Sequence, residues 1–143
     1  MNLLVLIAVF PLLLSVSVNT SWLEGNWYWS NKFGRDILIF RTNNNLVYQS
    51  DYKMDDEKKT YRLFGTWKFQ LGVCRSGDKQ EVDEGATVEG NLVLSIDSAQ
   101  CCLNAALLGN KLVLTKVWAK GSGLALHAYC SDNVLIPFET AIH

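Results

Sequence analysis

The chain has 143 residues, of which 49% are hydrophobic, and its 13 basic and 14 acidic side chains give a formal net charge of −1. This length is enough for one domain. Because the neutralisation of nucleic-acid phosphates requires a basic surface, the balanced charge argues against a nucleic-acid partner.

The first predicted element is a secretion leader over residues 1–17. This segment contains no charged side chain, and Ser15 and Ser17 supply the small residues expected at −3 and −1 of a cleavage site. An uncleaved anchor is the alternative, although the apolar run falls short of the about 20 residues that span a bilayer. We therefore expect 18–143 to be a secreted domain with no membrane partner. Asn19, in Asn-Thr-Ser, is a candidate glycosylation site.

After the leader, the sequence predicts an all-β fold. Short runs rich in aromatic and β-branched residues alternate with turn clusters about every eight to twelve residues, and no long segment has a helical period. The predicted strands are 23–30, 36–42, 46–53, 61–71, 91–97, 100–106, 111–119, 124–130 and 134–139, with a further short strand considered at 79–82 in the polar loop 72–85. Asparagine- and glycine-rich turns indicate antiparallel hairpins. We expect an up-and-down β-barrel of about eight strands, with a β-sandwich as the alternative.

Four cysteines follow the leader, an even number that predicts disulfide bonds in a small exported domain. Cys101 and Cys102 are neighbours, and adjacent Cα atoms are too close for a relaxed bridge between them. If both lie on a strand, their side chains leave opposite faces of the sheet. We therefore expect Cys74 to pair with one of them and Cys130 with the other, in either combination.

Catalytic and metal-binding motifs are missing from the sequence. It has no Gly-x-Ser-x-Gly elbow, no His-Glu-x-x-His and no Cys-x-x-Cys, and its histidines are His127 and the C-terminal His143. A triad of His127 with Ser122 or Asp132 would require near neighbours in sequence to assemble a catalytic site. We expect a protein that is not an enzyme and has no cofactor or metal ion.

The interior of an eight-stranded barrel has room for side chains or for one small ligand. Aromatic residues on the predicted strands are the candidates for lining a ligand cavity: Phe40, Tyr48, Trp67, Phe69 and Trp118. The alternative is that these rings fill the core. A filled barrel would act through its surface, as an extracellular inhibitor or interaction protein.

Three segments resemble the calycin barrels, above all the lipocalins. Residues 23–27 (LEGNW) are similar to the Gly-x-Trp sequence that opens the first lipocalin strand. Residues 65–69 (GTWKF) and 112–118 (LVLTKVW) resemble later strands of lipocalin-like domains. The resemblance implies a secreted, non-catalytic protein that binds a small apolar or amphipathic molecule.

The same resemblance implies structural roles for the first strand. In such barrels the ring of the Gly-x-Trp motif, here Gly25 and Trp27, closes one end of the barrel beneath a basic side chain from a late strand. Lys116 is placed to supply that side chain, and the contact would be a cation–π interaction. A plain exposed Lys116 is the alternative.

Avidins, a related barrel family, are similar to the chain at residues 23–27, at 67–69 and at the strand that ends in Trp118. The length after the leader is also closer to that of avidin. This second resemblance implies biotin binding by polar groups that follow the first strands. Ser30, Asn31 and Tyr48 could occupy such places if insertions are allowed.

Overall fold

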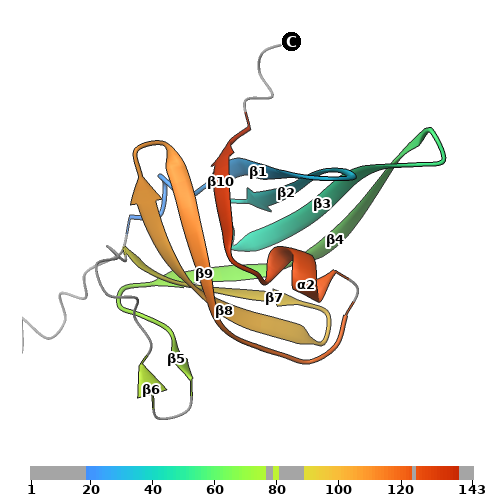
Figure 1. The fold of residues 1–143 in the computed structure, drawn as a ribbon. Coiled ribbons are helices and arrows are strands. Elements are labelled where there is room, and N and C mark those ends of the chain that lie inside the picture. Colours follow the sequence, from blue (N-terminus) through green and yellow to red (C-terminus); the bar gives the residue numbers. More distant parts are fainter. Residues whose placement is uncertain (1–18, 77–78, 81–88, 124, 139–143) are drawn as a thin grey trace, which may run out of the picture.

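The computed structural model describes residues 19–76, 79–80, 89–123 and 125–138, and its main body is a closed β-barrel (Figure 1). The predicted all-β, up-and-down topology is confirmed, because the eight antiparallel strands pair in chain order and the last pairs with the first. The expected leader lies outside the described residues. The barrel strands are β1 (Gly25–Asn31), β2 (Gly34–Phe40), β3 (Asn45–Met54), β4 (Glu57–Gln70), β7 (Gly90–Ile96), β8 (Ala99–Leu108), β9 (Lys111–Lys120) and β10 (Asn133–Pro137).

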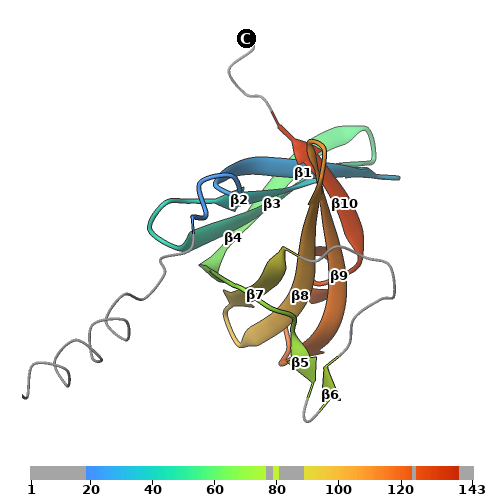
Figure 2. The ribbon, with the colours of Figure 1, turned by 90° about the vertical axis from the view of Figure 1, so that its left-hand side faces the viewer.

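A small hairpin stands apart from the barrel in the polar insertion between β4 and β7. Its strands are β5 (Arg75–Ser76) and β6 (Lys79–Gln80), which pair antiparallel. Figure 2 shows this hairpin extending beyond the barrel wall. The short strand considered at 79–82 is therefore present at its first two residues, while 81 and 82 lie outside the described residues.

The prediction of a strand over residues 124–130 is wrong. Residues Leu126–Tyr129 form the short helix α2, which is entered from Ala125 in the left-handed conformation (φ 68°). β10 pairs with β9 on one side and with β1 on the other, so the barrel closes without another strand. The apolar character of this segment reflects burial of Tyr129 and Cys130 against the barrel core. No helix in the described part of the chain has the length and apolar character needed to cross a membrane.

Strand β4 changes its pairing partner at Gly65. Its first part pairs with β3 and its last part with β7, and Gly65 pairs with residues of both neighbours, Leu46 and Ile96. A Cβ atom at this position would collide with the carbonyl oxygen of Ser95. Glycine therefore permits the close approach of β7 at the bend.

Aromatic rings fill one end of the barrel, here called the closed end. The rings of Phe40 and Trp67 meet edge to face at 5.5 Å, and Phe69 is in similar contact with Trp22 at 5.4 Å. The indole nitrogen of Trp67 donates a hydrogen bond to the Arg41 carbonyl oxygen at 3.0 Å. These contacts satisfy the polar atom of the ring while its apolar surface is buried.

Trp27 lies in the same closed end, as the Gly-x-Trp resemblance implies. Its side chain is 5% exposed and its indole nitrogen donates to the carbonyl oxygen of Leu23 at 2.8 Å. Lys116 is exposed, and the cation–ring contacts found among the described residues do not join it to Trp27. The ring is instead held by its hydrogen bond to the turn before β1, and the expected stacking of Lys116 on Trp27 is not seen.

Two disulfides attach other segments to opposite faces of β8. Cys101 is part of the barrel core and bonds to Cys130, whereas Cys102 bonds to Cys74. Adjacent cysteines on a strand thus reach different partners, as the sequence predicts. The Cys101–Cys130 bond ties the end of α2 to the barrel wall. Two disulfides fit an extracellular protein.

The hairpin of β3 and β4 extends beyond the rest of the barrel at the end opposite the closed end. Asp55 and Asp56 have φ values of 54° and 65° at its tip, as two-residue hairpin turns require. Residues 52–59, which form its outer part, are here called the arm. Most of their side chains are exposed.

Candidate functional site

A cavity of about 300 Å³ lies at the open end of the barrel, between the β1–β2 turn, the arm and α2. It is called the mouth pocket here. Its apolar and aromatic walls come from Phe33, Tyr48, Tyr52, Met54, Tyr61 and Ala128. Its polar groups come from Asn31, Asp36, Ser50 and Lys53.

The strand register places four side chains in one row across the inside of the barrel. Trp29 pairs with Asp36, Asp36 with Ser50, and Ser50 with Tyr61. Directly paired residues project from the same face of a sheet, so these side chains form a continuous strip over β1 to β4. The next row toward the closed end is more apolar and contains Tyr48 among its members. The interior therefore changes from apolar to mixed polar and aromatic at this level.

Tyr48 is the centre of an aromatic cluster below the mouth pocket. Its ring centre lies 6.4 Å from that of Trp29, 6.0 Å from that of Tyr61 and 5.5 Å from that of Tyr129 on α2. Such separations are typical of tilted and edge-to-face ring pairs. The cluster connects β1, β3 and β4 to α2 and lies beneath the pocket, where it is here called the aromatic floor.

Asp36 is the unusual group of this site. Its side chain is 5% exposed, and the carboxylate oxygen Oδ1 has no hydrogen-bond partner. Removing a carboxylate from water without a partner costs free energy, so such a group is uncommon in a folded protein. Asp36 is one of the residues that line the mouth pocket, and its Oδ1 atom is itself buried.

The phenol of Tyr48 stays neutral in this environment. Burial raises the pKa of Tyr48 far above its ordinary value, and the Asp36 carboxylate and Tyr61 raise it further, while a hydrogen bond with Ser50 offsets only part of the effect. Burial also raises the pKa of Tyr129, with a smaller contribution from Asp97. The hydroxyl of Tyr129 is a second buried polar atom without a partner.

The outer face of the same strands carries a hydrogen-bonded polar network. Asp51 accepts hydrogen bonds from Arg35 at 3.3 Å, Gln49 at 3.0 Å and Thr60 at 2.8 Å, and Arg62 donates to Gln49 at 2.7 Å. Burial alone would raise the pKa of Asp51, but the bonds from Thr60, Gln49 and Arg35 outweigh it and lower the pKa. The acidic group on this outer face is therefore satisfied, unlike Asp36.

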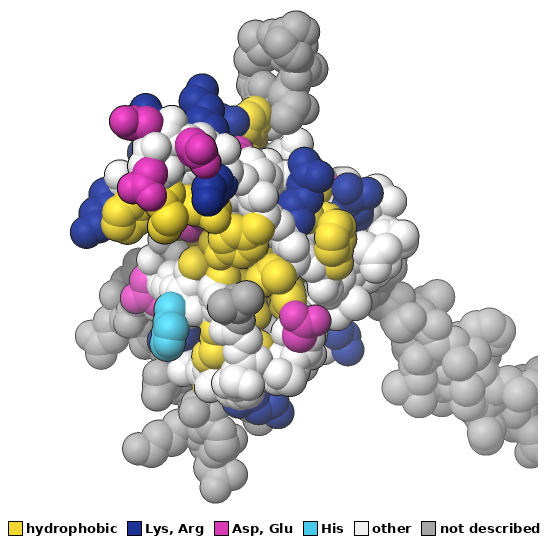
Figure 3. All heavy atoms as spheres, turned by 90° about the vertical axis from the view of Figure 1, so that its right-hand side faces the viewer, with side chains coloured by type: hydrophobic (Ala, Val, Ile, Leu, Met, Phe, Trp, Pro, Cys, Tyr) yellow, Lys and Arg dark blue, Asp and Glu magenta, His cyan; other side chains and the backbone are white. Residues whose placement is uncertain are grey.

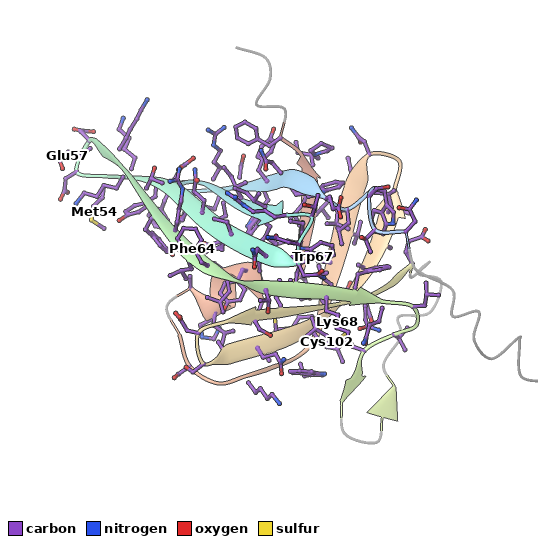
Figure 4. All side chains as sticks on the ribbon, turned by 180° about the vertical axis from the view of Figure 1, so that it is seen from behind. Met54, Glu57, Phe64, Trp67, Lys68 and Cys102 are labelled. Carbon is purple, nitrogen blue, oxygen red and sulfur yellow. A yellow bond between two sulfur atoms is a disulfide. The ribbon has the colours of Figure 1, made fainter. Side chains whose placement is uncertain are left out.

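A broader groove of about 1160 Å³ runs over this network and is called the outer groove. Phe33 and Phe64 border it with exposed fractions of 61% and 67%. Figure 3, which views the side on which the arm projects, shows hydrophobic side chains across the middle of the face and charged ones near its margin. Figure 4 shows Met54 and Glu57 at the tip of the arm, with Phe64 and Trp67 further along β4.

The predicted lining residues fall into three places. Tyr48 lies at the mouth pocket, whereas Phe40, Trp67 and Phe69 belong to the packed core of the closed end. Trp118 pairs with Cys102 on the outer face of the barrel, and the Lys120 ammonium lies 5.4 Å from its ring centre. None of those four rings lines the mouth pocket.

The three residues considered for an avidin-like site are also separated. Asn31 and Tyr48 both line the mouth pocket, while Ser30 lines the outer groove. The Asn31 side-chain oxygen already accepts hydrogen bonds from the backbone of Phe33 at 2.7 Å and Gly34 at 2.9 Å. Its main role is to hold the β1–β2 turn at the rim of the pocket.

Two other candidate residues lie away from the pocket. Asn19 is exposed, and its side-chain oxygen accepts hydrogen bonds from the backbone and hydroxyl of Ser21. His127 is exposed on α2. Among the described residues there is no cluster of three or more side chains suited to a metal ion.

Sequence reasoning identified Tyr48 and Asn31 but missed the other residues of the pocket, which are Phe33, Asp36, Ser50, Tyr52, Lys53, Met54, Tyr61 and Ala128. Alternation along the predicted strands could have placed Asp36 on the same face as Leu38 and Phe40, since residues two apart share a face. An acidic residue at an inward-facing position of a strand was the signal that could have indicated a pocket residue. Ala128 could not be found in this way because its segment forms a helix.

Comparison with known proteins gives no match: no family model and no curated protein matches the sequence, and no solved structure matches the fold. The closed eight-stranded antiparallel barrel is compatible with a calycin-like fold.

Proposed function

We propose that the protein is secreted and binds a small amphipathic molecule in the mouth pocket without catalysing a reaction. The observation that carries this proposal is the cavity itself: about 300 Å³ at the open end of a closed barrel, walled by aromatic and apolar side chains with a few polar groups. This combination is typical of small-molecule sites. The leader predicted over residues 1–17 and the two disulfides favour the extracellular location.

The packing below the pocket limits the size of the ligand. Leu38 and Leu94 are completely buried, and Phe40 is 1% exposed, so the interior beneath the aromatic floor is filled by side chains. A cavity of about 300 Å³ lies at the lower limit of the usual range for ligand sites. A long acyl chain would have to leave the barrel, whereas a compact molecule with one ring fits.

The proposal is tested by isothermal titration calorimetry and native mass spectrometry with a panel of compact one-ring compounds, to which biotin is added. Ala128→Trp places a large ring on the pocket wall at α2, and Val134→Trp places the same ring on an exposed β10 residue as the control. We expect at least one compound to bind the wild type and the control but not Ala128→Trp. Failure of every compound to bind the wild type would contradict the proposal.

A surface function is the second candidate, because two exposed phenylalanines flank the outer groove. Phe33 and Phe64 are 61% and 67% exposed, and exposed apolar residues that gather beside a groove often mark a protein interface. The protein would then act as an extracellular inhibitor or interaction protein. Loss of partner capture in Phe64→Ser, with small-molecule binding unchanged, would favour this function over the first.

A further inference from the structure

The mouth pocket combines a buried carboxylate with several aromatic rings. Asp36 is the one acidic or basic side chain of the described residues that is buried, and its Oδ1 lacks a partner. Tyr48 and Tyr61 stand beside it, one on each of the next two strands. A carboxylate acceptor next to ring faces suits an organic cation, because hydrogen bonding and cation–π attraction then act together.

We propose that the ligand of the mouth pocket is a small organic ammonium ion whose N–H donates to the Asp36 carboxylate while its carbon skeleton packs on the tyrosine rings. This inference rests on the proposed function and specifies the class of its ligand. The ammonium group supplies the hydrogen bond that the carboxylate lacks. The rings replace the water that the apolar part of the ligand loses on binding.

The basic side chains near the pocket do not pair with the Asp36 carboxylate. Arg35 follows the opposite alternation to Asp36, and it bonds to Asp51 on the outer face at 3.3 Å. Lys53 lines the rim of the pocket but is exposed, and Lys59 is exposed on the arm. Water and salt screen exposed ammonium groups more strongly than a buried carboxylate. Neither lysine makes a hydrogen bond or an ion pair with the Asp36 carboxylate in the structure.

The test compares three probes of nearly equal size at neutral pH: 2-phenylethylamine, which is then a cation, the neutral 2-phenylethanol, and phenylacetate, which is an anion. Titration calorimetry on the wild type should give an affinity at least about tenfold higher for the amine than for the alcohol, as a hydrogen bond to a charged group contributes more than a neutral one. We expect phenylacetate to bind most weakly. Equal affinities for amine and alcohol would overturn the inference and leave the proposed function standing. Absence of binding by all three would overturn both.

Two variants assign the preference to Asp36. Asp36→Asn keeps the size of the side chain but removes its charge, and it should bring amine and alcohol affinities to within about threefold. Asp97→Asn is the control: it removes one charge at an exposed turn where φ is 54°, a conformation that asparagine tolerates. It should keep the wild-type preference. Retention of that preference in Asp36→Asn would overturn the inference, and the wild-type comparison remains decisive if this variant fails to fold.

Discussion

Asp36 lies directly opposite Ser50 in the β2–β3 ladder, and both side chains face the inside of the barrel, where each is less than 8% exposed. One residue nearer the arm on each strand, Arg35 lies opposite Asp51 on the outer face, and the two form an ion pair. The same pair of strands thus presents a satisfied carboxylate to solvent and an unsatisfied one to the interior. A buried carboxylate oxygen without a hydrogen-bond partner lowers the stability of the fold. Functional sites often carry such a cost in stability.

Asp36→Asn should stabilise the protein without ligand. A neutral amide costs less to bury than a carboxylate with an unpartnered oxygen, so we expect the free energy of unfolding to rise by about 1 kcal/mol at neutral pH. Urea unfolding followed by circular dichroism measures it. Asp97→Asn should change stability by less than about 0.5 kcal/mol because it lies on the surface. A clear loss of stability in Asp36→Asn would show that the carboxylate has a partner in solution.

The two disulfides should contribute similarly to stability but differently to binding. Their sequence separations of 28 and 29 residues give nearly equal loop-closure entropies, each corresponding to about 3–4 kcal/mol. Replacing Cys101 and Cys130 with alanine should also weaken ligand binding, since this bond fixes α2 at the pocket. Replacing Cys74 and Cys102 should leave the affinity within about threefold, because Cys102 faces outward. Equal losses of affinity would contradict this assignment.

Asp51 should contribute to the acid dependence of stability. Its folded-state pKa is below the ordinary value of 3.8, so the native state takes up the proton less readily than the unfolded chain. The contribution is therefore complete above about pH 4 and is lost as pH falls through the lower folded-state pKa. Asp51→Asn should flatten the acid limb of a plot of unfolding free energy against pH, and Thr60→Val should give part of this effect. Parallel curves for wild type and Asp51→Asn would rule out the contribution.

Tyr48 should resist ionisation in alkaline solution. Its folded-state pKa is raised chiefly by burial, so its contribution to stability is complete below the unfolded-state pKa of about 10 and is lost as pH rises above that value. Absorbance at about 295 nm should show Tyr48 ionising only as the barrel unfolds. Tyr48→Phe should remove part of this late step. A fully reversible titration of every tyrosine near pH 10, with the fold intact, would be inconsistent with the buried position.

Much of the barrel was predictable from local patterns, but the location of the pocket was not. Short runs rich in aromatic and β-branched residues, separated by asparagine or glycine turns, identified most strands, and strand geometry explained why Cys101 and Cys102 need different partners. The segment 124–130 was misassigned because its apolar run is compatible both with a strand and with a short helix packed on the barrel. The inward position of Phe40, Trp67 and Phe69 was compatible either with lining a ligand cavity or with filling the core. Only the packing of the closed end shows that these rings fill the core. Asp36 became a candidate once the register placed it beside Ser50 and the tyrosines.

The most direct test of the account is an amide NMR titration of the ¹⁵N-labelled protein with 2-phenylethylamine. If the mouth pocket is the binding site, the largest shifts will occur at Asp36, Tyr48, Ser50, Tyr61 and Ala128, with little change at the closed end around Trp27 and Trp67. Saturation with shifts confined to the outer groove around Gln49, Arg62 and Phe64, or no shifts at millimolar ligand, would contradict the account.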